Sequence, residues 1–262
     1  MARLDVLLVH RSLFPSRERA KEEIIAGHVT VNGKPERRPG RETPESAKIT
    51  LTAEPLRYVG RGGLKLEKAL KTFGISPAGK VCLDCGASTG GFTDCLLQFA
   101  AEKVFALDVG SSQLSERLRN DSRVVSMENF NARDLRPEHL SDPPALITVD
   151  VSFISLRLVL PALAGVLKED GNIICLIKPQ FEAGRARLGK GGVIRDRAVH
   201  AQVLGELTEF FPSLGLSLQG LTWSPIRGGE GNLEFLCCLG RGGTSFRPEI
   251  PKIVEEAHRE LR

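Results

Sequence analysis

A glycine-rich turn between an apolar strand pattern and an apolar helical pattern is the feature that most constrains the fold of this chain. Residues 81–93 read VCLDCGASTGGFT, so an apolar run reaches Asp84, glycines follow at 86, 90 and 91, and a helical pattern begins at Phe92. Such a turn links a buried strand to a helix in α/β proteins that bind nucleotide-like ligands, and it also occurs as a plain connection without a ligand. The turn predicts an α/β core.

The charge of this turn favours one ligand over another. Its spacing fits a dinucleotide turn and an S-adenosyl-L-methionine turn equally, but a dinucleotide sets its pyrophosphate on the helix N-terminus beside a middle glycine. Here Ser88 takes the middle position, and Asp84 is expected at the mouth of the site. A carboxylate repels pyrophosphate and attracts sulfonium and ammonium groups. We therefore predict S-adenosyl-L-methionine, bound by Asp84, Gly86, Ala87, Ser88, Gly90, Gly91 and Phe92.

Strand and helix patterns alternate from Lys80 onward. This alternation is typical of a mainly parallel sheet covered on both faces, and the last two strands are candidates for antiparallel pairing. The predicted fold class is α/β, a Rossmann-like class I methyltransferase fold with seven strands. We expect strands at 81–85, 103–108, 123–127, 145–150, 172–178, 216–224 and 233–239, and helices at 64–73, 91–101, 111–119, 156–167 and 197–211.

Charged residues stand where several of these strands end. Asp108 lies about 20 residues after the glycine turn and ends the second strand. An acid at this position accepts the ribose hydroxyls of an adenosine ligand, and dinucleotide enzymes share this feature. Asp150 and Lys178 end two further strands, and the strand ends of an open sheet meet at one edge, although a lysine there can also extend into solvent. Glu234 enters the last strand and needs a cation nearby, because an unpaired buried carboxylate is costly.

The first quarter of the chain is basic. Residues 1–71 hold 15 Lys and Arg against 9 Asp and Glu, whereas the whole chain carries a net charge of +4. Two short helices are expected at 3–13 and 17–26, Asn32-Gly33 indicates a hairpin, and a strand is expected at 48–52. A compact basic unit of this kind suits a polyanion, although such charges also occur on solvated helix faces.

This order of elements resembles an S4 domain, a short RNA-binding module. The matching residues are Arg3-Leu4-Asp5, Ser16-Arg17 with Ala20, and GHVTVNGK at 27–34. We place this domain at 1–57, a linker at 58–63 and the methyltransferase domain at 64–262. A glycine-rich basic stretch at 184–192 is a second candidate for contact with phosphates, or a plain surface loop. The predicted RNA-binding residues are Arg3, Arg17, Arg19, Lys21, Lys34, Arg61, Arg185, Arg187 and Lys190.

Four charged residues carry a second resemblance. Lys65, Asp150, Lys178 and Glu234 match the Lys-Asp-Lys-Glu tetrad of ribose 2'-O-methyltransferases related to FtsJ. The whole chain is similar to the TlyA family of rRNA methyltransferases, also labelled hemolysins, through RGGLKL, DCGASTGGFTD, TVDVSFI, IKPQFE and GNLEF. The resemblance implies transfer of a methyl group from S-adenosyl-L-methionine to a cytidine 2'-hydroxyl of ribosomal RNA, free or in ribosomal subunits. It leaves the adenine contact near Asn131–Asp134 unassigned.

The chemistry of a ribose hydroxyl gives Lys178 two alternative roles. The hydroxyl is a poor nucleophile until it loses its proton, so alignment and a base are needed. Lys178 can take the proton only when its amine is neutral, a form that a desolvated site with Lys65 nearby would favour. A charged Lys178 could instead orient the hydroxyl by electrostatic attraction. Asp150 and Glu234 are expected to hold the two lysines in place.

Other functions find less support in the sequence. Asp150-Val-Ser-Phe153 lacks the two prolines common in amine methyltransferases, and none of the six cysteines stands in a loop suited to pyrimidine C5 chemistry. Cys82-x-x-Cys85 has no second pair, so we expect packing residues and no metal. No apolar run reaches the ~18 residues of a membrane span, and the charged start does not suit a signal peptide. We predict a cytoplasmic protein, with a membrane-lytic protein and an amine-methylating RNA-binding protein as alternatives.

Overall fold

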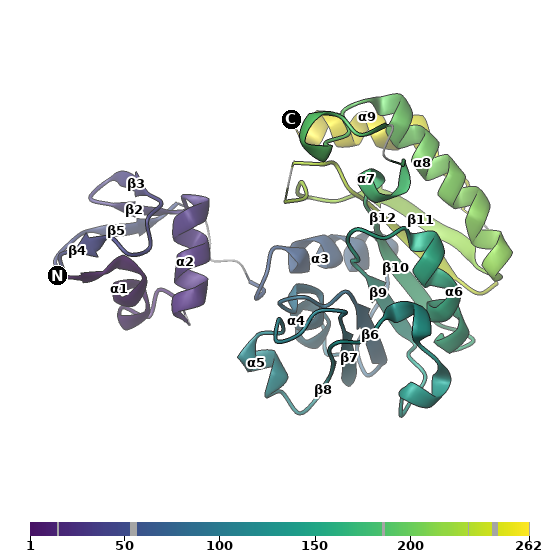
Figure 1. Ribbon diagram of the computed structural model, residues 1–262, viewed down its shortest axis with the longest axis horizontal. Helices are drawn as coiled ribbons and strands as arrows, with labels where there is room; N and C mark the ends of the chain where they lie inside the picture. Colours follow the sequence, from purple (N-terminus) through teal and green to yellow (C-terminus); the bar gives the residue numbers. More distant parts are fainter. Residues whose placement is uncertain (15, 53–56, 185–186, 230, 243–245, 262) are drawn as a thin grey trace. The chain divides into compact units, whose positions relative to one another are not determined.

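The chain forms two compact units, Met1–Val59 and Gly60–Arg262. The computed structural model describes residues 1–14, 16–52, 57–184, 187–229, 231–242 and 246–261 (Figure 1). The helix α3 (Gly62–Phe73) begins inside the stretch 58–63 that the sequence suggests as a linker. Each unit has its own hydrophobic core.

The first unit packs two short helices, α1 (Leu4–His10) and α2 (Arg17–Ala26), with three antiparallel strands. The strands are β3 (Lys34–Glu36), β2 (Val29–Val31) and β5 (Ile49–Leu51), in that order, and a further pair joins β1 (Ala2–Arg3) to β4 (Glu42–Thr43). Asn32 and Gly33 both have positive φ, as a tight two-residue hairpin requires. The helix predicted over 3–13 is shorter, because the backbone of Ser12 turns left-handed.

The second unit is built on one seven-stranded sheet, which confirms the predicted fold class. The strand order is β11-β12-β10-β9-β6-β7-β8. In Figure 1, α3 and α4 lie on one side of this sheet and α6 and α8 on the other. The strands are β6 (Val81–Cys85), β7 (Lys103–Leu107), β8 (Val124–Met127), β9 (Leu146–Val149), β10 (Asn172–Ile177), β11 (Ser217–Trp223) and β12 (Phe235–Gly240). The remaining helices are α4 (Gly91–Gln98), α5 (Glu116–Arg119), α6 (Leu156–Val166), α7 (Pro179–Glu182), α8 (Arg197–Phe210) and α9 (Ile250–Glu260).

The antiparallel pairing expected for the last two strands is confirmed, because β12 pairs antiparallel with β11 and also with β10, so β11 runs in the same direction as β10. One sequence expectation about this unit needs correction. The helix expected at 111–119 is confined to α5. The Glu128 carboxylate accepts the N–H groups of Ser112, Gln113 and Leu114, and this holds the residues before α5 in a loop.

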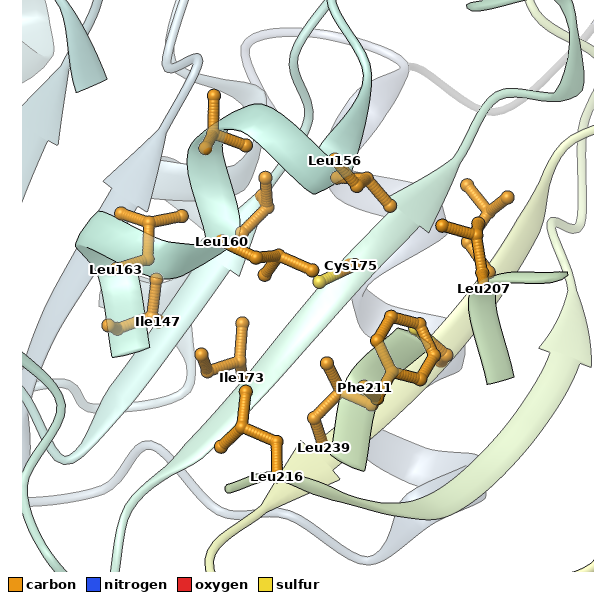
Figure 2. Packing of buried hydrophobic residues seen from close by; sticks show 14 of the residues in the cluster. Ile147, Leu156, Leu160, Leu163, Ile173, Cys175, Leu207, Phe211, Leu216 and Leu239 are labelled. Carbon is orange, nitrogen blue, oxygen red and sulfur yellow. The ribbon is translucent and has the colours of Figure 1, made fainter. Parts of the chain in front are cut away.

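The main core lies between the sheet and the helices α6 and α8. Figure 2 shows Leu156, Leu160 and Leu163 of α6 packed over Ile147 of β9 and Ile173 of β10. All six cysteines are buried and free, and Cys85, Cys175 and Cys237 belong to this core. Within the described residues, no helix is long and apolar enough to cross a membrane, and no cluster of three or more His, Cys, Asp or Glu side chains could hold a metal ion.

Candidate active site

The glycine turn after β6 brings the ends of two neighbouring strands into contact. Gly86 has a φ of 87°, and a Cβ atom there would lie 2.5 Å from the carbonyl oxygen of Asp150, which follows β9. Gly90 also has positive φ and lies against the side chains of Leu114 and Leu118. Glycine at position 86 therefore permits the close approach between the turn and Asp150 at the end of β9.

Asp108 joins this turn to the end of β7. One carboxylate oxygen accepts the N–H of Ser88 at 2.7 Å, and the other accepts the N–H of Gly110 at 2.8 Å. These bonds fix the carboxylate at the edge of the sheet. Each oxygen retains a lone pair that could accept a hydroxyl group of a ligand.

A pocket of about 410 Å³ opens beyond these strand ends. Its size is in the range of pockets that enclose a small-molecule ligand. The loops after β6, β7, β8 and β9 each contribute to it, so its walls come from four neighbouring strand ends, as expected for an open α/β sheet. The lining includes Gly86, Ser88, Leu107, Asp108, Val109, Gln113, Phe130, Asn131, Ala132, Arg133, Asp150, Val151, Ser152, Phe153 and Ile154.

A second, more polar pocket of about 260 Å³ adjoins the first. The two pockets share Gly86, Ser88, Asp150 and Ser152. The second is also lined by residues of the turn and of the start of α3, and by the side chain that follows β10: Gly60, Arg61, Gly62, Ala87, Thr89, Gly91, Phe92 and Lys178. Asp150 therefore stands between two adjoining spaces.

Lys178 forms an ion pair with Asp150 at this junction. The ammonium nitrogen lies 2.6 Å from Oδ1 of Asp150 and donates a hydrogen bond to the hydroxyl of Ser152 at 2.8 Å. Both strands end here, and Pro179 starts α7 directly after the lysine, so the side chain is held at the sheet edge rather than in solvent. The alternative that Lys178 extends into solvent is thereby excluded.

Lys65 and Glu234 form a second ion pair that is nearly fully buried. The ammonium nitrogen lies 2.6 Å from Oε2 of Glu234, and the side chains are only 10% and 3% exposed. Burial raises the pKa of Glu234, and the charge of Lys65 opposes that shift. Asp150 and Lys178 also act on the pKa of Glu234, so the two ion pairs belong to one electrostatic cluster. Neither Lys65 nor Glu234 lines the two pockets.

Asp84 differs from its predicted position. It is fully buried below the turn and lines neither pocket, so it does not lie at the mouth of the site. Its carboxylate accepts hydrogen bonds from the hydroxyls of Thr93, at 2.7 Å, and Thr148, at 3.1 Å. Burial raises the pKa of Asp84 to about 7. The carboxylate joins β6 to β9 and α4 and thus shapes the turn from below.

The other predicted donor-site residues surround the pockets. Gly86, Ser88 and Asp108 line the larger pocket, and Gly86, Ala87, Ser88, Gly91 and Phe92 line the smaller one. Gly90 lines neither and serves the geometry of the turn. Sequence reasoning did not identify Gln113, Phe130, Ser152 or Phe153, because their positions in loops carry no periodic signal.

Two of the predicted RNA-binding residues of the first unit, Arg3 and Arg17, lie at its surface beside the buried carboxylate of Asp5. Arg3 and Arg17 each approach Asp5 to 3.1 Å, and both guanidinium side chains remain about half exposed. Lys34 is exposed on the β2–β3 hairpin and Lys21 is partly exposed on α2. The side chain of Arg19 lies outside the described residues. Arg38 and Arg41, which pair with the buried Glu36, are further exposed cations that the prediction missed.

Four predicted cations belong to the second unit. Arg61 lines the smaller pocket and donates to the carbonyl of Arg227 at 3.4 Å. Arg187 lies 4.0 Å from Glu206, at the limit of an ion pair. Arg185 and the side chain of Lys190 lie outside the described residues. Of the two cations whose side chains are described, Arg61 lies at the site and Arg187 lines neither pocket.

Comparison with known proteins places these features in a family. The FtsJ-like methyltransferase family matches residues 58–241, and the S4 domain family matches residues 2–46. YqxC of Bacillus subtilis, named as a candidate rRNA methyltransferase, is 48% identical over 99% of this chain and 95% of its own length. The 16S/23S rRNA (cytidine-2'-O)-methyltransferase TlyA of Mycobacterium tuberculosis is 44% identical over 99% of this chain and 97% of its own length. The solved structure of a candidate hemolysin from Streptococcus thermophilus is 45% identical in sequence and superposes with a TM-score of 0.80. The match covers 99% of this chain and 96% of the hemolysin chain.

Proposed function

The chain belongs to the FtsJ-like methyltransferase family, and we propose that it transfers a methyl group from S-adenosyl-L-methionine to the 2'-hydroxyl of a cytidine in ribosomal RNA. One observation carries this proposal. The Lys178–Asp150 ion pair stands at the junction between a pocket large enough for the donor and a polar pocket beside it. A ribosomal substrate also implies a cytoplasmic protein.

The larger pocket fits the adenosine part of the donor. Asp108 presents carboxylate oxygens that can accept the two ribose hydroxyls, as acids at this strand end do. Phe130 and Ala132 offer apolar surface for adenine, and the backbone between them offers polar groups for its edge. We assign the adenine contact to residues 130–133. Gly86 and Ser88, which line both pockets, would hold the methionine part.

The smaller pocket fits the acceptor ribose. Lys178 and Asp150 line its wall, and Arg61 adds a cation that can contact a phosphate of the same nucleotide. The exposed ring of Phe153, 88% accessible, stands beside Ser152 and can stack against a base drawn out of the RNA. The acceptor hydroxyl would thus meet the lysine and the aspartate together.

The ion pair favours the second of the two roles open to Lys178. When bound, S-adenosyl-L-methionine supplies an electrophilic methyl group on a sulfonium. Lys178, held by its ion pair with Asp150, can donate a hydrogen bond to the acceptor oxygen and orient its lone pair. The hydroxyl proton becomes acidic as the O–C bond forms, and Asp150, which lines both pockets, is placed to accept it. The buried pair Lys65–Glu234 fixes the field around these groups.

The direct test is methyl transfer from labelled S-adenosyl-L-methionine to ribosomal subunits that lack ribose methylation. We expect donor-dependent labelling of a cytidine ribose, detected as a phosphodiester bond that resists alkaline cleavage on the 3' side of the modified nucleotide. Label on a base, or transfer to protein alone, would contradict the proposal. Free ribosomal RNA and each isolated subunit, tested in parallel, define the substrate.

A further inference from the structure

The short helix α7, which follows Lys178 directly, holds the loop between β9 and α6. Its last residue, Glu182, accepts a hydrogen bond from the Ser155 hydroxyl at 2.6 Å and another from the Leu156 N–H at 2.8 Å. The two segments are far apart in sequence and belong to neighbouring strands of the sheet. A single carboxylate therefore fastens the end of this loop to the segment that carries Lys178.

The two hydrogen bonds stabilise the start of α6. Leu156 is the first residue of that helix, and its N–H has no partner within the helix. A negative charge at a helix N-terminus is favourable, and Ser155 already acts as the N-cap by accepting the N–H of Arg157. Burial raises the pKa of Glu182, while its two hydrogen bonds act in the opposite direction. Glu182 thus provides the hydrogen-bond partner of the Leu156 N–H at this helix end.

Two more contacts join the same segments. Lys178 donates to the hydroxyl of Ser152 at 2.8 Å, and the rings of Phe153 and Phe181 lie 5.0 Å apart at a tilt of 50°. Phe153 has a φ of 63°, which a bulky residue adopts only when its surroundings impose it. The loop therefore depends on α7 for a conformation that it would not adopt alone.

This loop forms one wall of the site. Ser152, Phe153 and Ile154 line the larger pocket, and Ser152 also lines the smaller one. Glu182 lines neither pocket. Any displacement of the loop would change the shape of the donor pocket and remove the hydrogen bond that orients Lys178.

We infer that Glu182 is a positioning residue, which holds the loop 151–155 in the conformation that binds the methyl donor and orients Lys178. The inference rests on the proposed function, since it assigns the larger pocket to the donor. Glu182 acts through Ser155 and Leu156 and touches no reacting atom.

The test compares Glu182→Ala with Glu182→Gln in the full chain. Glutamine retains an oxygen that accepts the Leu156 N–H and an amide that can donate to Ser155, so it should restore what alanine removes. We expect Glu182→Ala to weaken S-adenosyl-L-methionine binding, measured by calorimetry, by about tenfold and to lower turnover at saturating donor. Glu182→Gln should bind within about threefold of the wild type.

Asp196→Ala is the matched control. Asp196 caps α8 by accepting the N–H of Ala198 at 2.8 Å and lines neither pocket. Its loss removes a helix cap of the same kind, so it should lower the melting temperature without changing donor affinity. Ser155→Ala removes one of the two contacts of Glu182 and should weaken donor binding by less than Glu182→Ala does. If Glu182→Ala does not fold, the donor affinity of Ser155→Ala tests the inference instead.

The inference is wrong if Glu182→Ala binds the donor within twofold of the wild type, or if Glu182→Gln loses as much affinity as alanine. It is also wrong if Glu182→Ala does not fold and Ser155→Ala binds as the wild type does. Donor binding is read without any RNA. A wild-type protein that binds the donor but labels no ribose would therefore contradict the proposed function and leave this test intact.

Discussion

At the scale of single residues, the two ion pairs of the site differ in what surrounds them. The Lys178–Asp150 pair borders both pockets, whereas the Lys65–Glu234 pair is enclosed by protein, with Gly228 so close that a Cβ there would lie 2.5 Å from the carboxylate. Removing one partner of a buried ion pair leaves the other charge buried without a partner, which lowers the free energy of unfolding by several kcal/mol. Substitutions of Lys65 or Glu234 will therefore mix loss of activity with loss of stability.

The buried carboxyl of Asp84 gives a prediction about pH. Its pKa is raised to about 7 in the folded protein from an ordinary value of 3.8, so between about pH 4 and pH 7 the folded state binds more protons than the unfolded state. The free energy of unfolding should accordingly fall as pH rises through this window. Asp84→Asn removes this dependence. The free energy of unfolding of the variant, relative to that of the wild type, should therefore rise by up to about 4 kcal/mol as the pH increases toward 7.

Urea unfolding of both proteins at intervals from pH 4.5 to 8 measures that difference. The hydroxyls of Thr93 and Thr148 contact Asp84, and the asparagine oxygen can still accept one of their hydrogen bonds. A difference in unfolding free energy that stays flat across the window would contradict the raised pKa. A difference that shrinks as pH rises would contradict its sign.

At the scale of elements, the glycine turn and the strand end beside it act as one unit. Gly86→Ala would place a methyl group against the backbone of Asp150 in a left-handed conformation. We expect Asp150 to be displaced and donor affinity to fall at least tenfold, because the clash adds to a backbone strain of about 1–2 kcal/mol.

Gly215→Ala separates these two effects. Gly215 also has positive φ, at 69°, but no atom lies within 4 Å of the position that its Cβ would occupy. The control should lose stability through backbone strain and keep its donor affinity. Equal donor affinity in Gly86→Ala and Gly215→Ala would show that the approach of Gly86 to Asp150 does not shape the pocket.

The elements also show what the sequence could predict. The turn at 86–91 and the strands of the sheet were predictable because apolar runs and glycine spacing are local patterns, and each predicted strand lies within two residues of the observed one. The meeting of Asp150 and Lys178 followed from the convergence of strand ends, whereas the pairing of Lys65, on α3, with Glu234 followed only from the resemblance to ribose 2'-O-methyltransferases.

Other features depend on contacts between distant segments and were missed. The helices α7 and α9 were not predicted, and neither was the position of β12 between β10 and β11. Asp84 was placed at the mouth because its neighbours suggested a strand end, whereas Thr148 of β9, which encloses it, is 64 residues away. Burial of this kind is set by packing that no local pattern reports.

At the scale of the whole molecule, the proposed function assigns RNA recognition to the S4 unit, Met1–Val59, and chemistry to the methyltransferase unit, Gly60–Arg262. The S4 unit carries exposed cations, and those paired with buried carboxylates, such as Arg3 and Arg17 around Asp5, are part of its own fold. Lys21 and Lys34 have no ion pair among the described residues, so they are better probes of RNA contact.

Lys21→Ala and Lys34→Ala should each weaken RNA binding whatever the base sequence and reduce the salt dependence of the binding constant by about one unit of slope. Turnover at saturating RNA should stay unchanged, because the site lies in the other unit. Lys252→Ala on α9 is the control, since that exposed lysine lies outside both pockets. Binding titrations across a range of salt concentrations measure the slopes, and slopes equal to that of the wild type would contradict phosphate contact.

The central claim, that Lys178 beside Asp150 carries out transfer to a ribose hydroxyl, is tested most directly by measuring donor binding and methyl transfer in Lys178→Ala and Lys178→Arg. We expect Lys178→Ala to bind S-adenosyl-L-methionine within about threefold of the wild type and to lose at least about a hundredfold in turnover on ribosomal RNA. Lys178→Arg, which keeps the charge but cannot act as a base, should retain measurable activity if the charge orients the hydroxyl. Near-normal turnover in Lys178→Ala would contradict the claim.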